Sequence, residues 1–267
     1  MTRIGRLFER LRKEDRRPAL IAYLTAGDPA LERTPSLVAA LERGGADLIE
    51  LGVPFSDPVA DGPVIQRASE RALRAGTRLR GVLEAARRIR ASSEIPILLF
   101  TYLNPALRYG IETLARDAAA AGIDGCLFTD LSVEEAEDYV AAMRRHGLDT
   151  VFLAAPTSPP ERLRLVAEHS SGFVYLVSRT GVTGERESLS SAVEPLVKAM
   201  REITGLPLAV GFGISKPEHA AAVGALADGV VVGSAFVRLV EKHAGAGELE
   251  SRLEALAREL AAALPRK

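Results

Sequence analysis

The hydrophobic positions of the chain form short apolar runs that alternate with longer stretches of helical periodicity. Each run is rich in Val, Ile, Leu and Ala and is followed by turn residues, and most of the runs lack a polar/apolar alternation. Parallel strands that are covered on both faces have this pattern. The runs predict eight buried strands, at Ala19–Leu24, Leu48–Leu51, Ile97–Phe100, Gly125–Phe128, Thr150–Ala154, Phe173–Val177, Leu208–Gly211 and Gly229–Val232.

The regular alternation of strand and helix predicts an α/β fold, for which two architectures are available. An open doubly wound sheet usually carries a G-x-G-x-x-G turn after its first strand, whereas here the first strand ends in Thr25-Ala-Gly-Asp-Pro29. We therefore predict a single (β/α)8 TIM barrel spanning residues 1–267 as one domain, with an extra N-terminal helix. In such barrels the active site forms at the C-terminal ends of the strands.

Three predicted helix starts carry Ser three positions before Glu, at Ser132–Glu135, Ser158–Glu161 and Ser215–Glu218. In a capping box the Ser and Glu side chains each accept a free backbone N–H of the first helical turn. We expect a capping box at each of these starts. An Ala/Leu/Glu/Arg segment from Glu248 to Leu264 predicts a last helix that closes the barrel.

Composition narrows the class of protein. The chain of 267 residues carries 34 basic and 35 acidic residues, a net charge of −1, without the basic stripe that nucleic-acid binding requires. The N-terminus has no apolar signal core, and no run reaches about 18 apolar residues, so we expect a cytoplasmic protein without a membrane span. The single cysteine, Cys126, lies in an apolar run and is expected to be a buried thiol.

Two carboxylates stand out at the end of the second predicted strand. Glu50 interrupts the apolar run Leu-Ile-Glu-Leu, and Asp61 follows in a loop rich in Pro, Gly and Asp. Desolvation of a buried carboxyl raises its pKa toward the range of a general acid. Asp61 by itself is also typical of a turn. Together, two carboxylates at one strand end in different environments predict acid–base chemistry there.

Small residues follow the sixth, seventh and eighth predicted strands. Gly184 belongs to the loop after the sixth strand, Gly211 and Gly213 flank the end of the seventh, and Gly233-Ser234 follows the eighth before an apolar helix. Glycine allows backbone N–H groups to approach an anion, and a helix N-terminus adds a favourable dipole. Barrels often bind phosphate at this position, so we expect a phosphate site here.

The positions of the histidine and lysine residues disfavour a metal-dependent or Schiff-base mechanism. The histidines are scattered through helical stretches, and no lysine lies within a predicted strand; Lys216 comes nearest to a strand end. Carbon–carbon cleavage in this chain would therefore need a substrate that supplies its own electron sink. The histidines are His146, His169, His219 and His243.

The run GADLIELGVPFSDPVADGPVIQRAS, from Gly45 to Ser69, closely resembles the signature of the tryptophan synthase α-subunit family. The likeness extends over about Ala19 to Val240. One departure is Asp130-Leu-Ser132, where the family often has Asp-Leu-Pro. Further matching segments are Tyr23–Pro29, Thr101–Pro105, Ala155–Ser158, Tyr175–Gly184 and Gly211–Ser215.

The resemblance implies a TIM-barrel lyase that cleaves indole-3-glycerol phosphate to indole and glyceraldehyde 3-phosphate. It implies that Glu50 is the general acid/base and that Asp61 binds the indole N–H and is oriented by Thr183. The substrate-binding residues implied or expected are Tyr23, Tyr102, Leu127 and Tyr175 around indole, and Gly184, Gly211, Phe212, Gly213, Gly233 and Ser234 around the phosphate.

The family works as an αββα assembly, so the resemblance also implies a β-subunit partner that carries pyridoxal phosphate, with no cofactor in this chain. The sequence leaves three alternatives open: a stand-alone lyase that releases free indole, another phosphosugar barrel such as an isomerase or epimerase, and a non-catalytic activator of a β subunit. Retention of both Glu50 and Asp61 argues against the last two.

Overall fold

The computed structural model describes residues 1–177, 192–211 and 213–266, whose strands all belong to one parallel sheet. The order of the strands is β5-β4-β3-β2-β1-β9-β8-β7-β6, so that β1 pairs with both β2 and β9 and the sheet curls on itself. The strands are β1 Ala19–Thr25, β2 Leu48–Gly52, β3 Ile97–Thr101, β4 Gly125–Phe128, β5 Asp149–Thr150, β6 Leu153–Ala154, β7 Val174–Val177, β8 Leu208–Gly211 and β9 Gly229–Val232.

The expected fifth strand is divided into the short strands β5 and β6, and this division explains why nine strands are present instead of eight. β5 pairs with β4, while β6 pairs with β7. The two residues between them continue the same ladders, since the N–H of Val151 donates to the carbonyl of Cys126 at 3.1 Å and that of Tyr175 to the carbonyl of Phe152 at 3.1 Å. The chain itself therefore closes the ring, as a (β/α)8 barrel requires.

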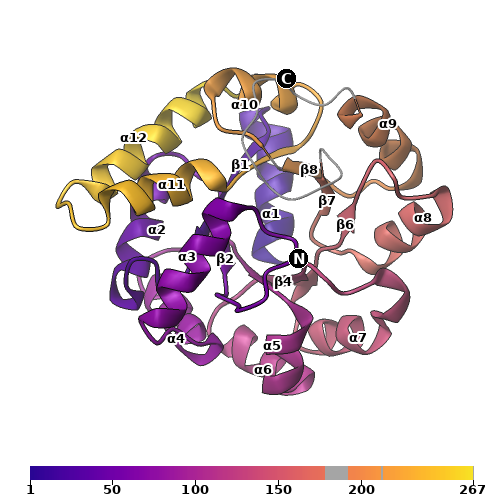
Figure 1. The fold of residues 1–267 in the computed structure, drawn as a ribbon. Helices are drawn as coiled ribbons and strands as arrows, with labels where there is room; N and C mark the ends of the chain where they lie inside the picture. Colours follow the sequence, from indigo (N-terminus) through magenta and orange to yellow (C-terminus); the bar gives the residue numbers. More distant parts are fainter. Residues whose placement is uncertain (178–191, 212, 267) are drawn as a thin grey trace.

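Helices surround this sheet, and Figure 1 shows them as an outer ring with α1 in the middle of the ring. The α-helices are α1 Arg3–Arg10, α2 Thr34–Arg43, α3 Pro63–Arg74, α4 Leu79–Arg90, α5 Leu103–Tyr109, α6 Ile111–Ala120, α7 Glu137–Arg145, α8 Pro160–His169, α9 Val193–Ile203, α10 Pro217–Gly224, α11 Ser234–His243 and α12 Leu249–Ala262. Short helical turns are η1 Leu11–Asp15, η2 Leu31–Arg33 and η3 Val133–Glu135.

The prediction of capping boxes at three helix starts is wrong. η3 follows Ser132 without a side-chain cap, and the Ser132 hydroxyl instead contacts Glu134. α8 and α10 begin at Pro160 and Pro217, each two residues after the expected capping serine, and neither has a side-chain cap. Proline needs no partner for its missing N–H in the first turn, which explains why the helices start there.

Strand alternation separates two apolar cores. Ile21 and Leu48 belong to the cluster inside the barrel, whereas their neighbours Leu20 and Ile49 belong to the cluster between the sheet and the helices. Successive side chains of a strand point to opposite faces, so the continuous apolar runs are needed because both faces are buried. The buried thiol of Cys126 lies in the outer cluster, as expected.

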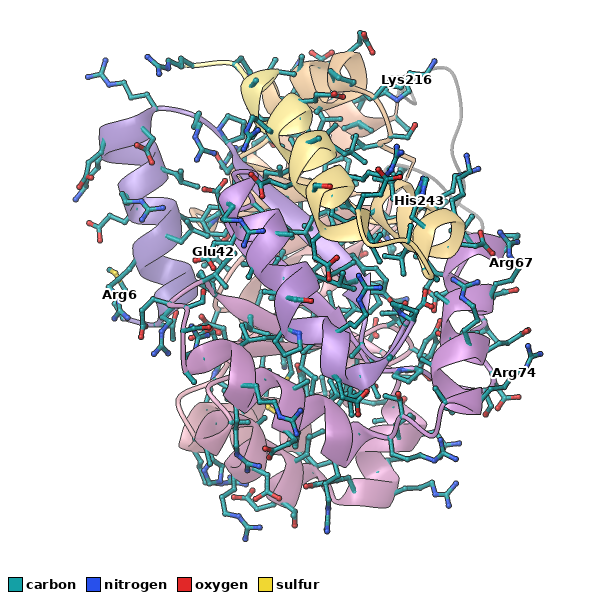
Figure 2. All side chains as sticks on the ribbon, turned by 90° about the vertical axis from the view of Figure 1, so that its left-hand side faces the viewer. Arg6, Glu42, Arg67, Arg74, Lys216 and His243 are labelled. Atoms are coloured by element: carbon teal, nitrogen blue, oxygen red, sulfur yellow. The ribbon has the colours of Figure 1, made fainter. Side chains whose placement is uncertain are left out.

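Helix α1 closes the N-terminal end of the barrel. Its residues Ile4, Leu7 and Phe8 pack into the inner cluster, and Phe8 lies against Phe173 with ring centroids 5.7 Å apart. In Figure 2, Arg6 on α1 lies at one end of the molecule, and Arg67 on α3 lies toward the other. The helix thus seals the end of the barrel opposite the C-terminal ends of the strands.

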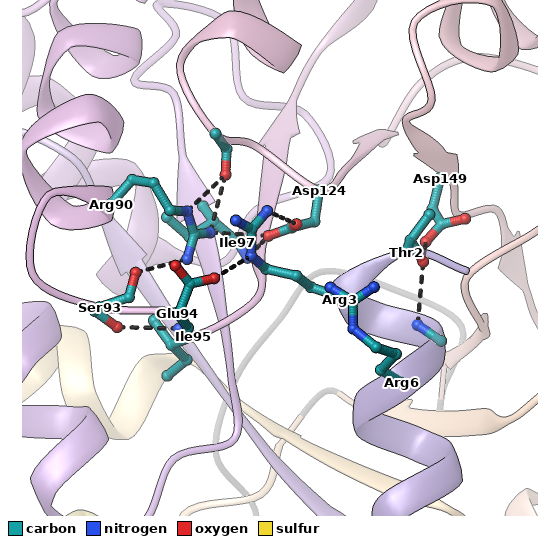
Figure 3. A network of polar contacts seen from close by, with 12 residues as sticks. Thr2, Arg3, Arg6, Arg90, Ser93, Glu94, Ile95, Ile97, Asp124 and Asp149 are labelled. Atoms are coloured by element: carbon teal, nitrogen blue, oxygen red, sulfur yellow. Dashed lines mark hydrogen bonds and ion pairs between the residues drawn. The ribbon is translucent and has the colours of Figure 1, made fainter.

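A polar network fastens the start of α1 to the barrel (Figure 3). Arg3 pairs with Glu94 at 2.7 Å and with Asp124 at 3.1 Å, and Thr2 donates to Asp149. Asp124, which is 5% exposed, also accepts from the N–H of Ile97 at 2.8 Å. The network therefore joins the helix to the beginnings of β3, β4 and β5.

Within the described part of the chain, no helix has the length and apolar character needed to cross a membrane.

Candidate active site

Strand alternation turns Glu50 toward the inside of the barrel. In β2, Leu48 packs in the inner cluster and Ile49 and Leu51 pack in the outer one, so Glu50 faces inward with Leu48. Its Cα pairs in register with that of Tyr23 on β1. The side chain is 1% exposed, and burial raises the pKa of Glu50 from 4.5 to about 8. Glu50 is therefore a neutral carboxylic acid near pH 7.

Nothing in the described part of the chain hydrogen-bonds the Oε1 atom of Glu50. A buried polar atom without a partner lowers stability, so such atoms are uncommon in folded proteins and often mark functional positions. An unpartnered, protonated carboxyl inside an apolar barrel is suited to give its proton to a bound molecule.

Asp61 lies in the loop between β2 and α3, two residues before Pro63 starts that helix. It is 5% exposed, and burial raises the pKa of Asp61 to about 6, although a hydrogen bond from the hydroxyl of Tyr102 lowers it. The same tyrosine oxygen accepts from the N–H of Ala60 at 3.1 Å. Tyr102 thereby holds both the loop and its carboxylate, and Asp61 is mostly ionised near pH 7.

Two tyrosines reach over neighbouring strand ends because glycines leave room for them. A Cβ atom at Gly52 would lie 2.3 Å from the hydroxyl oxygen of Tyr23, and one at Gly211 would lie 2.1 Å from that of Tyr175. At distances below 3.0 Å the tyrosine ring or the backbone would have to move. Both glycines therefore set the positions of the aromatic rings beside Glu50.

On the other side of the site, the chain presents backbone groups at the start of a helix. Gly213 has a φ of +90°, which favours glycine, and Gly233 caps α11, which starts at Ser234. The first N–H groups of a helix have no partner within it, and the dipole there is positive. This side of the site can bind an anion such as phosphate.

A salt-bridge network connects the two sides. Arg71 of α3 donates two hydrogen bonds to Asp28 in the loop after β1, at 2.9 and 2.8 Å, and pairs with Glu241 of α11 at 3.0 Å. Asp28 is 2% exposed. Because α3 follows the loop of Asp61 and α11 starts at Ser234, these bonds help to fix the distance between carboxylate and anion site.

The space between these groups is narrow, about 40 Å³. About 10–15 Å³ of such space is enough to hold one water molecule, so the site as it stands has room for a few water molecules, and a bicyclic ring would enter once lining side chains moved. A larger hollow of about 490 Å³ lies at the N-terminal end of the barrel. It contains no buried carboxyl pair, so the narrower space between Glu50 and Asp61 is the candidate active site.

Comparison with known proteins agrees with this geometry. A sequence model of the tryptophan synthase alpha chain family matches residues 8–265. The chain belongs to this family. It is 71% identical over 260 residues to the tryptophan synthase alpha chain of Solibacter usitatus, with 97% of each chain covered, and 54% identical over 253 residues to that of Geotalea uraniireducens, with 95% and 94% covered.

Solved structures show the same fold. The structure of tryptophan synthase from Mycobacterium tuberculosis superposes with a TM-score of 0.91 at 43% identity and covers 98% of both chains. A tryptophan synthase alpha subunit from Pyrococcus furiosus superposes with a TM-score of 0.84 at 41% identity, over 92% of this chain and 98% of that one. The predicted TIM-barrel class and the alpha chain family are thus confirmed.

The structure brings most of the expected site residues of this alpha chain together. Leu127 lies in the inner cluster, Tyr102 lies beneath the Asp61 loop, and Gly211 lies against Tyr175. Thr183, Gly184 and Phe212 are outside the described residues. The expected residues that line the narrow space are Tyr23, Glu50, Asp61, Tyr175, Gly213, Gly233 and Ser234.

Four apolar lining residues of the alpha chain were missed by sequence reasoning: Ile65, Phe100, Ile214 and Val231. Phe100 packs edge-on against Tyr23, with ring centroids 5.3 Å apart. The signal that could have found it and Val231 is their inward position in a predicted strand. In the described ranges, no group of three or more His, Cys, Asp or Glu could hold a metal ion.

Proposed function

We propose that this chain is the alpha subunit of a tryptophan synthase and that Glu50 and Asp61 perform its reaction, the cleavage of indole-3-glycerol phosphate to indole and glyceraldehyde 3-phosphate. The observation that carries the assignment is the pair of buried carboxyls facing one space, with pKa values of about 8 and about 6. Two carboxyls whose environments separate their pKa values can act near pH 7 as an acid and as a carboxylate.

In the first step the neutral Glu50 gives its proton to C3 of the indole ring. The ring becomes iminium-like, and the positive charge is shared with the ring nitrogen. The ionised Asp61 accepts the hydrogen bond of the ring N–H and stabilises that charge, an electrostatic contribution to lowering the barrier.

In the second step the glycerol hydroxyl next to the ring loses its proton to the Glu50 carboxylate. A carbonyl forms at that carbon, the bond between it and C3 breaks, and the bonding electrons return to the ring. The products are indole and glyceraldehyde 3-phosphate, and Glu50 regains its proton. The substrate ring serves as the electron sink, so the reaction requires neither a lysine nor a metal ion.

The other side of the site binds the phosphate. Gly213, Gly233 and the start of α11 at Ser234 offer backbone N–H groups. The family resemblance adds Gly184 to this group and gives Thr183 the role of orienting Asp61, and Phe212 is a further expected substrate-binding residue. The rings of Tyr23, Tyr175 and Phe100, which line the same space, hold the indole.

The partner is a tryptophan synthase β subunit in an αββα assembly, and pyridoxal phosphate belongs to that subunit; the setting is cytoplasmic. Two large apolar side chains that are unusually exposed support a contact at this end of the barrel. Val59, in the Asp61 loop, is 74% exposed, and Leu107, on α5, is 59% exposed. Both follow the C-terminal ends of neighbouring strands, next to the proposed site.

The test is the Glu50→Gln variant, with the exposed Asp57→Asn, in the loop that follows β2, as a matched control. Loss of general acid–base catalysis should lower kcat about 10²- to 10⁴-fold in Glu50→Gln, while Asp57→Asn keeps the wild-type kcat. If Glu50→Gln keeps most of its rate, the acid–base role is wrong. If both variants and the wild type leave the substrate intact but activate a β subunit, the non-catalytic alternative holds.

The pH profile supplies an independent test. Activity needs Asp61 ionised and Glu50 protonated, so kcat/KM should be bell-shaped, with limbs near the pKa values of about 6 and about 8. A profile that falls neither below the lower pKa nor above the higher one would contradict the assignment. Turnover of an unrelated phosphosugar without cleavage would favour an isomerase or epimerase.

A further inference from the structure

We propose that the hollow at the N-terminal end of the barrel is a second ligand site, which binds a small molecule with a flat apolar body and a single anionic group. This basal hollow lies between the α1–η1 segment on one side and the beginnings of β1, β7, β8 and β9 on the other. Its volume of about 490 Å³ lies within the range of about 300–1,000 Å³ that is typical of small-molecule sites.

The spacing of residues along α1 and η1 shows how one wall of the basal hollow is made. Phe8 and Glu9 follow Gly5 by three and four residues, and Arg12 of η1 follows Phe8 by four, so these residues lie on one side of the segment, and all of them line the hollow. The start of the same helix is bound to the barrel through Arg3 and its carboxylate partners (Figure 3). One part of the helix is thus anchored to the barrel, while Gly5 and Phe8 contribute to the wall of the hollow.

The opposite wall combines the apolar Leu206 and Pro207 with the ion-paired Arg201 and Asp228. Leu206 and Pro207 lead into β8, and Gly205 beside them has nothing within 4 Å of the position of a Cβ atom. A side chain at Gly205 would therefore have room to extend at the edge of the hollow, which Gly205 lines together with Gly172. Between Phe8 on one wall and Pro207 on the other, an apolar ring would replace water against apolar surface.

The charges around the hollow are unequal. Arg17 is neutralised by Asp47 at 2.7 Å, Arg201 by Asp228 at 2.5 Å, and Glu9 by Lys13 at 2.5 Å. Arg12 and Arg16 also line the hollow, and neither makes an ion pair within residues 1–177, 192–211 and 213–266. Arg12 and Arg16 favour an anion because guanidinium groups that are not held in an ion pair can form paired hydrogen bonds with carboxylate, sulfonate and phosphate groups.

The backbone supports a functional interpretation of Arg16. Its φ of +50° is left-handed, and it follows the π-helical turn η1. Left-handed non-glycine residues and π-helical turns are uncommon and are enriched at functional sites. Here they place Arg16 at the hollow, where it accompanies Arg12.

The test uses anilinonaphthalene sulfonate, an aromatic anion whose fluorescence rises in apolar sites, and its uncharged relative phenylnaphthylamine. Two variants alter the site: the pair Arg12→Ser with Arg16→Gly removes two positive charges, and Gly205→Leu adds a large apolar side chain at a position that lines the hollow. Each has a matched control. Arg108→Ser with Arg164→Ser removes two exposed arginines without ion pairs in the described residues, and Gly245→Leu adds a side chain where nothing lies within 4 Å.

The wild type should bind the sulfonate at one saturable site. Removing the two arginines should weaken that binding by about tenfold or more, Gly205→Leu should abolish it, and the controls should leave it unchanged. Phenylnaphthylamine should bind more weakly and should not respond to the arginine pair. Equal affinity of the sulfonate for every variant overturns the site. Loss with Gly205→Leu alone, with no effect of the arginines, overturns the anionic class of the ligand.

Discussion

The Glu50→Gln substitution removes a titrating proton from the barrel interior and leaves the side chain almost unchanged in size. Burial raises the pKa of Glu50 from 4.5 to about 8, so the folded protein keeps this proton over a pH range in which the unfolded chain releases it. The wild type is therefore stabilised by the group below pH 4.5 and loses that stability as pH rises through about 8. Glutamine cannot ionise, so the variant avoids the loss.

The size of the effect follows from the same two values. Each pH unit between the unfolded and folded pKa values changes the free energy of unfolding by about 1.36 kcal/mol. The interval from 4.5 to about 8 then lowers the free energy of unfolding of the wild type by about 5 kcal/mol. This loss is complete above about pH 8. Folded proteins are stable by only about 5–15 kcal/mol in total, so the loss is large enough to measure.

Urea unfolding of both proteins at several pH values from about 5 to about 9 measures the free energies of unfolding. The advantage of Glu50→Gln over the wild type should grow by about 1.4 kcal/mol per pH unit and level off above pH 8. The exposed Glu259→Gln is the matched control and should follow the wild type. Parallel pH curves for Glu50→Gln and wild type would refute the raised pKa and with it the neutral acid.

Three further predictions concern the rest of the site. Asp61→Asn should lower kcat about 10²- to 10³-fold and remove the acidic limb of the pH profile; steady-state kinetics in which that limb persists would exclude Asp61 as its source. Tyr102→Phe removes a hydrogen bond that lowers the pKa of Asp61, so the acidic limb should move to higher pH, and an unmoved limb would count against this contact. Gly211→Ala places a Cβ atom 2.1 Å from the Tyr175 hydroxyl and should raise KM and lower the free energy of unfolding by about 1–3 kcal/mol, whereas Gly245→Ala, with open space around it, should do neither. Equal KM values for these two glycine variants would show that Tyr175 tolerates displacement.

The fold could be predicted because each strand is buried on both faces. Eight apolar runs separated by helices leave few arrangements, and the absence of a glycine-rich dinucleotide turn after Thr25 favours the barrel. The division of the fifth strand could not be predicted, because Thr150–Ala154 has the same apolar character as its neighbours. Its Val151 and Phe152 bond to different neighbouring strands, which depends on closure of the whole ring.

The carboxylates could be predicted from local pattern, since Glu50 is polar within an apolar strand. The prediction of capping boxes was wrong for α8 and α10 because these helices start at Pro160 and Pro217, without a side-chain cap. Contacts between distant segments carry no such local pattern. The bonds of Arg71 to Asp28 and Glu241, and the roles of Gly52 and Gly211 under tyrosine rings, depend on neighbours that only the folded barrel brings together.

The most direct test is the release of glyceraldehyde 3-phosphate from indole-3-glycerol phosphate by the purified chain, without and with a tryptophan synthase β subunit. We expect slow release by the chain alone, a sharp increase with the β subunit, and loss of both rates in Glu50→Gln. Fast release at a rate that does not change when the β subunit is added would identify a stand-alone lyase. The absence of release under either condition would contradict the proposed chemistry of Glu50 and Asp61.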